Sequence, residues 1–293
     1  MSDGSAQATQ SPTPEKKSSP FRRRIPPFGQ LISPARLENW RRGLVLTALT
    51  ALVFLAGWQG MHNSLTPNIP GPLQTWNRAQ ELFANPFAQT GPNTAGIGIQ
   101  VLYSLGRVAA GFGLAVLVGV PLGFLMGMLP TFRAMLEVII NLLKPVSPLA
   151  WLPIGLLMFR SATPSAIFVV FITCIWPTVI NTAQGVASVP QDYLNVARVL
   201  RMGRWTTSLR ILLPAAAPSM LTGMRLSLGV AWMVIVAAEM LTGGIGIGFF
   251  IWDEWNNLNV ASILVAIGVI GVVGIVLDGV MSILQRRLAH PNR

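Results

Sequence analysis

Charged side chains are rare in this sequence. Only 11% of its 293 residues are Asp, Glu, Lys or Arg, whereas 52% are hydrophobic. Soluble domains carry about 25% charged residues, so the shortage excludes an ordinary soluble domain and indicates an integral membrane protein. A membrane-spanning helix needs roughly 20 mostly apolar residues, and the chain contains several runs of that length.

Reactive and metal-binding residues are also scarce. Cys174 is the only cysteine, which excludes a disulfide within the chain. The only histidines are His62 and His290, so no zinc-ligand spacing is available. The acids expected within the membrane lack the serine and histidine partners of a hydrolase: Glu137, Glu239 and Asp278. We therefore expect no metal site, no bound cofactor and no enzymatic activity in this chain.

Lysine is much rarer than arginine, and its placement excludes a nucleotide site. The phosphate-binding loop of an ATPase ends in Gly-Lys-Ser or Gly-Lys-Thr. None of the lysines (Lys16, Lys17 and Lys144) follows a glycine. Any ATP hydrolysis coupled to this chain therefore belongs to another subunit.

Six long apolar runs are present, separated by polar breaks. They predict an all-α integral membrane protein with six transmembrane helices, near residues 43–62, 100–129, 133–159, 164–187, 216–241 and 260–284. Residues 1–36 are rich in Ser, Pro, Gln and basic residues, which predicts a disordered basic cytoplasmic tail before a membrane domain over 37–293. The first run could be a signal peptide, but its long basic lead and missing cleavage site favour an uncleaved anchor.

The basic residues are unevenly distributed. Most of the 21 Lys and Arg residues lie in the tail, in the break at 195–214 and after the last run. Because loops with excess Lys and Arg remain in the cytoplasm, we predict that both termini and this break are cytoplasmic. The same rule accounts for the net charge of +11, so no nucleic-acid partner is expected. On the opposite side, Trp252 and Trp255 either anchor an interfacial helix or dock an external partner.

The break at 195–214 contains an amphipathic pattern. A helix over Asn195–Trp205 separates an apolar face from a basic face: Val196, Val199, Leu200 and Gly203 against Arg198, Arg201 and Arg204. Such a helix could lie on the lipid surface with its arginines toward anionic headgroups. It could instead fill a groove on a soluble partner.

The same residues resemble the cytoplasmic EAA loop of binding-protein-dependent ABC importer permeases. That pattern reads Glu-Ala-Ala, three residues, Gly, nine residues, Ile, one residue, Leu-Pro. Residues 211–214 match its end, which places residues 195–197 on Glu-Ala-Ala and Arg201 on the glycine. Two identities differ, because Asn195 replaces the acid and Arg201 the glycine, with Gly203 two positions later.

The resemblance covers roughly residues 40–288 and extends to the nitrate/taurine/sulphonate branch. "SLGRVAAGFGLAVLVGVPLGFLMG", "LKPVSPLAWLPIGLLMF", "LTGMRLSLGVAWMVIVAAEM" and "VLDGVMSILQRR" are similar to that branch, and "AAEMLTGGIGIGFFIWDEWNN" is similar to its nitrate, bicarbonate and cyanate subgroup. It implies a type I ABC importer permease domain at 37–293, with a coupling loop at 190–214. The implied coupling helix comprises Asn195, Val196, Ala197, Arg198, Val199, Leu200, Arg201, Met202 and Gly203.

The resemblance also implies partners and a location. It implies a homodimer of this chain in a bacterial inner membrane, two ABC ATPase subunits that bind ATP and magnesium, and an external solute-binding protein or lipoprotein. The expected function is ATP-driven import of a small inorganic anion, with nitrate or nitrite first and bicarbonate, cyanate, taurine or sulphonates as alternatives. Two alternative functions belong to other classes of protein: an ion-gradient-driven secondary transporter and a membrane scaffold that transports nothing. The first would show acids at mid-depth and inverted repeats, and the second would have little use for a proline-broken, lysine-bearing span.

Three cations fall within the predicted spans. Lys144 lies among Pro145, Pro148 and Pro153, where a broken helix must be covered by protein or water, so we expect it inside the bundle. Arg225 is expected at about the same depth in the membrane as Lys144. Arg107 is expected nearer the outer face, as a charge that draws anions into a funnel. Charges at such depth are paired with acids or face a water path, so these three either form structural pairs or attract the anion.

Small residues repeat along the second run every fourth position: Gly111, Ala115, Gly119, Gly123 and Gly127. This stripe lets another helix approach closely. The partner is either a helix of the same chain or a second subunit. The same two partners are possible for the last run, which contains Gly268, Gly271 and Gly274.

Overall fold

The computed structural model of the chain describes residues 34–289 except 65–68, 90 and 92–94. Regular structure in this described part is helical, apart from one antiparallel bridge between Gln89 and Ala95. The prediction of an all-α chain is confirmed. The predicted tail over residues 1–36 lies almost wholly outside the described residues.

The long helices cover the apolar runs: α1 (Pro34–Ser64), α3 (Ile97–Met128), α6 (Ala162–Ala187), α9 (Leu213–Thr242) and α11 (Val260–Ala289). The shorter helices are α2 (Pro72–Ala84), α4 (Pro130–Leu143), α5 (Leu152–Phe159), α7 (Gln191–Val199), α8 (Arg204–Thr207) and α10 (Ile247–Asn256). A 3₁₀ turn over Pro148–Trp151 precedes α5, and a π turn over Ser208–Leu212 precedes α9. Among the described residues, five helices can span a membrane by length and composition, or six if α4 and α5 form one broken span.

The chain divides into two compact units, residues 1–57 and 58–293. In the first unit the structure describes most of α1, whose side chains from Val45 to Leu55 are exposed. An apolar helix that its own unit does not cover is suited to lipid or to another protein surface. In the second unit, Trp58 and His62 bond the carbonyl oxygens of Pro70 and Ile69, which fixes the end of α1 to the start of α2.

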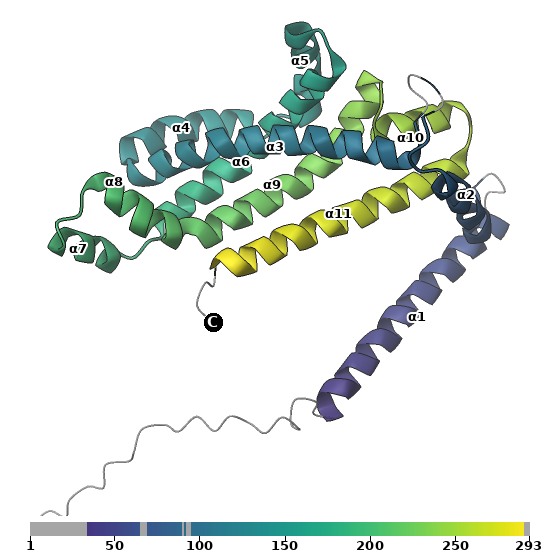
Figure 1. Ribbon diagram of the computed structural model, residues 1–293, viewed down its shortest axis with the longest axis horizontal. Coiled ribbons are helices and arrows are strands. Elements are labelled where there is room, and N and C mark those ends of the chain that lie inside the picture. Colours follow the sequence, from purple (N-terminus) through teal and green to yellow (C-terminus); the bar gives the residue numbers. More distant parts are fainter. Residues whose placement is uncertain (1–33, 65–68, 90, 92–94, 290–293) are drawn as a thin grey trace, which may run out of the picture. The chain divides into compact units, whose positions relative to one another are not determined.

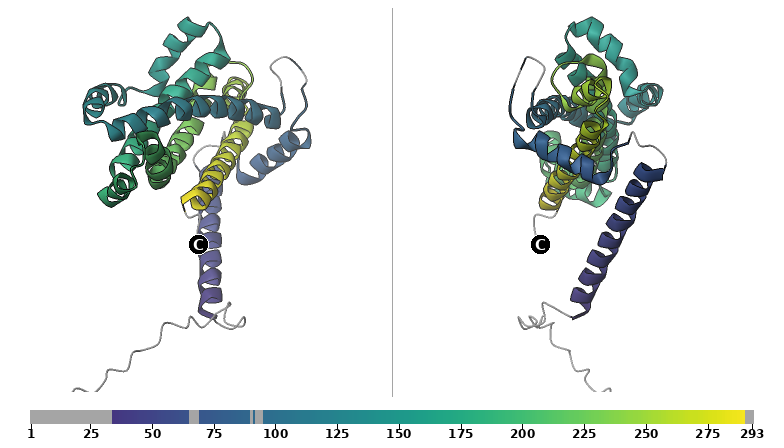
Figure 2. Two further views of the ribbon diagram at one scale, coloured as in Figure 1. Left: turned by 60° about the vertical axis from the view of Figure 1, so that its left-hand side comes forward. Right: turned by 90° about the vertical axis from the view of Figure 1, so that its right-hand side faces the viewer.

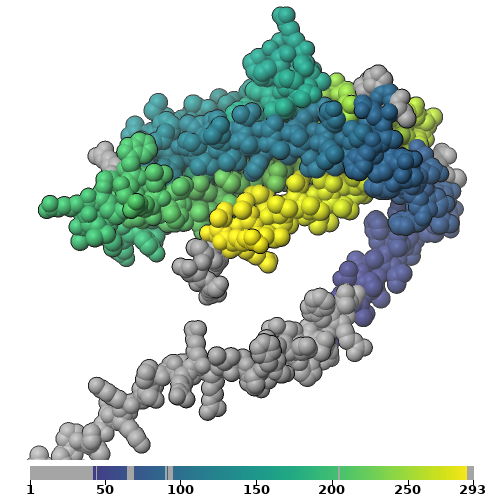
Figure 3. Space-filling model, viewed as in Figure 1, coloured from purple at the N-terminus to yellow at the C-terminus, as the bar shows by residue number. Residues whose placement is uncertain are grey.

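The core of the second unit is a bundle of α3, α6 and α9, which lie side by side along the length of the molecule (Figures 1 and 2). Helix α11 packs on α9, and α10 packs on both. Helices α7 and α8 lie at one end of the bundle, and α2 and α10 lie at the other (Figure 1). The space-filling view in Figure 3 shows one face of α11 uncovered. The bundle therefore has two separate ends at which a partner could bind.

The small-residue stripe of α3 faces α6. An added Cβ at Gly111 would lie 2.6 Å from Val170, and one at Gly123 would lie 2.5 Å from the Val179 carbonyl oxygen. Glycine is required there because the two backbones approach closely. The stripe thus packs within this chain. On α11 an added Cβ at Gly268 or Gly271 meets no atom of the chain within 4 Å.

The third predicted span, residues 133–159, is not one straight helix. Helix α4 ends at Leu143, and the chain resumes as a helix from Pro148 at an angle of 93°. Prolines lack the backbone donor that continues a helix, so Pro145 and Pro148 interrupt the hydrogen-bond ladder where the bend occurs. Figure 1 shows α5 projecting away from the bundle.

Candidate functional site

The loop between α6 and α9 forms a short helix that begins and ends earlier than predicted. The expected helix over Asn195–Trp205 is instead α7, Gln191–Val199, followed by a turn before α8. The N–H of Met202 donates to the Ala197 carbonyl (2.9 Å), and the N–H of Arg201 donates to the Arg198 carbonyl (3.0 Å). This pair of bonds is a Schellman motif, which ends a helix with one residue in the left-handed conformation.

Arg201 is that residue, with φ of +48°. The position usually carries glycine, because a Cβ disfavours positive φ. Gly203, which the apolar pattern assigned to the helix, lies beyond its end. The predicted coupling helix over 195–203 is therefore corrected at both ends.

Several apolar side chains of α7 and of the residue after it face away from the chain. Ala197 is buried against the bundle, whereas Val196, Val199 and Leu200 are exposed, with Val199 at 83%. Trp205, at the start of α8, is also 83% exposed. Apolar side chains stabilise a fold when they are buried. A cluster of exposed apolar side chains therefore indicates a surface for lipid or for another protein.

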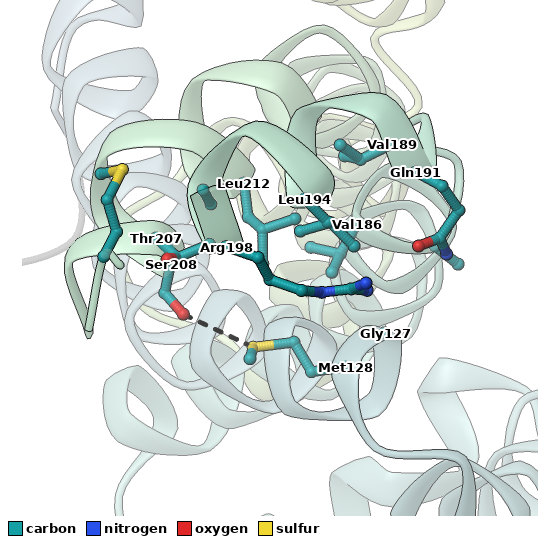
Figure 4. A pocket seen from close by; sticks show the side chains of 13 residues that line it. Gly127, Met128, Val186, Val189, Gln191, Leu194, Arg198, Thr207, Ser208 and Leu212 are labelled. Atoms are coloured by element: carbon teal, nitrogen blue, oxygen red, sulfur yellow. Dashed lines mark hydrogen bonds between the residues drawn. The ribbon is translucent and has the colours of Figure 1, made fainter. Parts of the chain in front are cut away.

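A pocket of about 480 Å³ lies beneath α7, between the ends of α3 and α6 and the start of α9. Figure 4 shows Arg198 extending across it, with Leu194 and Val186 beside the arginine. On its floor the Ser208 hydroxyl contacts the Met128 sulfur at 3.8 Å. Helix α7 is thus held mainly by Ala197, and its base is incompletely packed.

Lys144 lies at the bend after α4, and it is exposed rather than inside the bundle of this chain. Glu137, an acid on the preceding helix α4, bonds Arg133, at 2.7 Å. Among the described residues no carboxylate lies within 4.0 Å of the Lys144 ammonium. An unpaired cation beside a broken helix is placed to face water or another subunit.

Arg225 is paired, as one of the two interpretations expected. Its Nε and Nη2 donate to the two carboxylate oxygens of Asp278, each at 2.6 Å, which joins α9 to α11. Both side chains remain partly exposed, at 39% and 55%. The geometry is the bidentate one in which an arginine fork recognises a planar pair of oxygens.

Arg107 does not line an open funnel, because its side chain is only 7% exposed and pairs with the fully buried Glu239 at 2.6 Å. Glu239 also accepts a bond from Ser104, and Arg107 donates to Thr163. A carboxylate with no solvent is stable only with such partners. This cluster joins α3, α6 and α9.

The glycine-rich turn between α9 and α10 completes the buried cluster. The Gly248 N–H donates to Glu239 and the Ile247 N–H to Ser104. An added Cβ at Gly246 would collide with the Glu239 carboxyl, so the turn can approach this carboxyl only with glycine at that position. The sequence contained the signal, an acid followed by four glycines within nine residues, but not the partner on α3.

A family comparison matches the larger part of the chain. Residues 119–290 match the model of the binding-protein-dependent transport system inner membrane component. The chain belongs to this family. This match confirms the resemblance of the loop residues to the permease subunit of an ABC importer.

Named relatives cover most of the permease. It is 43% identical over 242 residues to the nitrate import permease protein NrtB of Synechocystis sp., with 83% of this chain and 88% of the relative covered. It is 44% identical over 259 residues to the bicarbonate transport system permease protein CmpB of Synechococcus elongatus, with 86% and 93% covered.

A solved structure supports the fold of the permease. The MetNI methionine ABC transporter, in an inward-facing conformation, matches with a TM-score of 0.60 at 12% identity, over 66% of this chain and 95% of the other. At this low identity the match supports only a shared fold. Among the described residues of the permease, no three His, Cys, Asp or Glu side chains come together as a metal site requires.

Proposed function

We propose that this permease is the membrane-spanning subunit of an ATP-driven importer of nitrate or nitrite, with bicarbonate as the second candidate. The observation that carries the proposal is the 43% identity to a nitrate permease over 83% of the chain. The bicarbonate candidate has a specific observation of its own, the 44% identity to a bicarbonate permease. Nitrate and bicarbonate are both small planar oxyanions.

The surface of α7 is the proposed contact with the ATPase subunit. A soluble motor can grip an exposed apolar helix in a groove, with Val196, Val199 and Leu200 as anchors. The pocket beneath α7 leaves space into which this helix can tilt. ATP and magnesium belong to two such ATPase subunits, which act on a dimer of this chain.

The proposed orientation places α7 in the cytoplasm and α10 outside. Arg198 lies on α7 and Arg201 in the turn after it, Arg286 and Arg287 lie in the last turn of α11 toward the α7 side, and Asp253 and Glu254 lie on α10. This distribution agrees with the positive-inside rule. Both termini are then cytoplasmic, and an external solute-binding protein delivers the anion at the α10 end.

Alternating access is the proposed mechanism. The motors close on ATP, displace α7, and rock the two permease copies so that a path between them opens to one side and then the other. Lys144 and Arg225 are the proposed cations of this path. Arg107 is excluded from it, because Glu239 holds it in the protein interior.

Uptake measured in a strain that lacks this chain tests the proposal. Nitrate, nitrite, bicarbonate, cyanate and taurine are supplied as labelled substrates, and nitrate or nitrite uptake is expected to be lost and restored by the cloned gene. Loss of bicarbonate uptake alone would select the second candidate. Intact uptake of all five would contradict an importer of these anions.

Purification of the tagged chain in mild detergent separates the rival classes. A P-loop ATPase is expected to co-purify with the chain. Its absence, combined with uptake that follows an ion gradient, would favour a secondary transporter. Its absence without any uptake would favour a scaffold.

A further inference from the structure

In the part of the chain that the structure describes, Arg107–Glu239 and Arg225–Asp278 are ion pairs that each join two helices, and they differ in how exposed they are. The Arg107 and Glu239 side chains are 7% and 0% exposed, whereas those of Arg225 and Asp278 are 39% and 55% exposed. The first pair is closed to a small solute in this structure. A small solute can reach the second pair directly from the surface of the chain.

The accessible pair lies at membrane depth. At a rise of about 1.5 Å per residue, Arg225 is roughly 18 Å along α9 from Leu213, and Asp278 is roughly 17 Å from the end of α11. Both are about 26 Å from the opposite helix ends, so they fall within a hydrocarbon core about 30 Å thick. Charges at this depth face water or protein rather than lipid.

Another polar contact and two open glycine positions lie along the seam between α9 and α11. Toward the α7 end, about one turn from Arg225 along α9 and about two turns from Asp278 along α11, the Gln285 amide donates to the Thr222 hydroxyl at 3.0 Å. On the other side, an added Cβ at Gly229 or Gly271 would meet nothing within 4 Å. No atom of this chain therefore fills the space next to these two glycines, which lie about one and two turns from Arg225 and Asp278.

The bidentate geometry identifies the chemistry that could replace Asp278. Both guanidinium donors are 2.6 Å from oxygens of one planar group. Nitrate and bicarbonate present two oxygens of a planar group in the same way as a carboxylate. We infer that Arg225 is an oxyanion site of the translocation path, which Asp278 occupies between transport events and which a planar oxyanion takes by displacing Asp278. This inference rests on the proposed function as an importer of such an anion.

Exchange at this site is energetically feasible because the pair is exposed. Ion pairs in contact with water shift an equilibrium by only about two- to fivefold, so in a water-filled path an anion at elevated local concentration competes with Asp278. The returning carboxylate then releases the anion, and a path site has to bind weakly enough to release its ion. Arg107 cannot act in this way, because Glu239 is enclosed.

The test uses the complete purified complex of permease and ATPase subunits. Its thermal unfolding midpoint is measured against nitrate, bicarbonate and chloride at constant ionic strength, together with nitrate uptake in cells. Nitrate and bicarbonate are expected to raise the midpoint saturably, and spherical chloride is not. Asp278→Asn should lower the half-saturating nitrate concentration about two- to fivefold, because the competitor is gone. The matched control Glu137→Gln removes a carboxylate from the exposed pair with Arg133 and should change nothing.

A neutral double variant separates an anion site from a structural pair. Arg225→Gln with Asp278→Asn leaves no unpaired charge, so the complex is expected to assemble but to lose both the nitrate-dependent shift and uptake. Uptake or a nitrate response like wild type in this variant would overturn the inference, and so would its failure to assemble. An unchanged half-saturating concentration in Asp278→Asn would also overturn it. In each case uptake that still depends on the chain would leave the proposed function intact, whereas uptake unaffected by its deletion would remove the proposed function itself.

Discussion

At the scale of single residues, Arg201 shows how a helix end can be set by position rather than by residue preference. Its φ of +48° satisfies the Schellman bonds that stop α7, although glycine is the usual occupant. The resemblance to the EAA pattern places the family's glycine at this same position. The structure thus gives that glycine a physical reason, a left-handed backbone at the helix end.

Arg201→Gly is expected to stabilise the loop by about 1 kcal/mol, because glycine adopts positive φ without the Cβ penalty. Hydrogen exchange of residues 191–207 should slow roughly fivefold. Arg198→Gly is the matched control, since Arg198 lies inside α7 and glycine there should cost about 0.5–1 kcal/mol and speed exchange. Faster exchange in both variants would contradict the left-handed assignment.

At the scale of elements, the sequence predicted which segments are helices better than where they bend or end. Lipid satisfies no backbone hydrogen bond, so long apolar runs must be helical, and the long helices followed from composition alone. Pro145 and Pro148 indicated a break after α4 but not its 93° direction, because missing donors do not specify where the chain turns. The end of α7 was mislocated because Arg201, a residue that normally avoids positive φ, adopts it.

The close contact of α3 with α6 is expected to tolerate no added methyl group. Gly123→Ala places a Cβ 2.5 Å from the Val179 carbonyl oxygen, and overpacking of this kind costs about 1–3 kcal/mol. Gly113→Ala on the open side of α3 meets nothing within 4 Å and should be neutral or slightly stabilising, because alanine favours the helix. Thermal unfolding of the solubilised chain measures both, and equal midpoints would contradict the packing described for the stripe.

Helix α7 is expected to bind the ATPase through its exposed apolar residues. Val199→Glu changes a side chain that is 83% exposed, so the chain should fold normally but lose co-purifying ATPase. Leu258→Glu is the control, because Leu258 is 82% exposed near the opposite end of the bundle. Undiminished ATPase recovery with Val199→Glu would exclude this face as the contact and return α7 to the lipid surface.

At the scale of the whole molecule, the chain combines a fixed end with an adjustable end. The buried cluster around Glu239 fastens α3, α6, α9 and the glycine-rich turn before α10. Beneath α7, by contrast, the pocket leaves the opposite end loosely packed. Sequence alone could not pair Arg107 with Glu239, because the contact joins helices far apart in the chain. The sequence placed Arg107 nearer the outer face and Glu239 within the membrane, and it did not identify a partner for either.

Breaking the fixed end should therefore affect the entire bundle. Glu239→Gln leaves the Arg107 guanidinium buried without its counter-charge, which costs about 3–5 kcal/mol, whereas Glu81→Gln breaks an exposed pair with Arg78 and should cost less than about 1 kcal/mol. The first variant is expected to unfold at a markedly lower temperature and to reach the membrane in smaller amounts. Replacing both partners, as in Arg107→Met with Glu239→Met, should recover part of the loss because no charge is left buried. If Glu239→Gln and Glu81→Gln unfolded at the same temperature, the cluster could not be what holds α10 to the bundle.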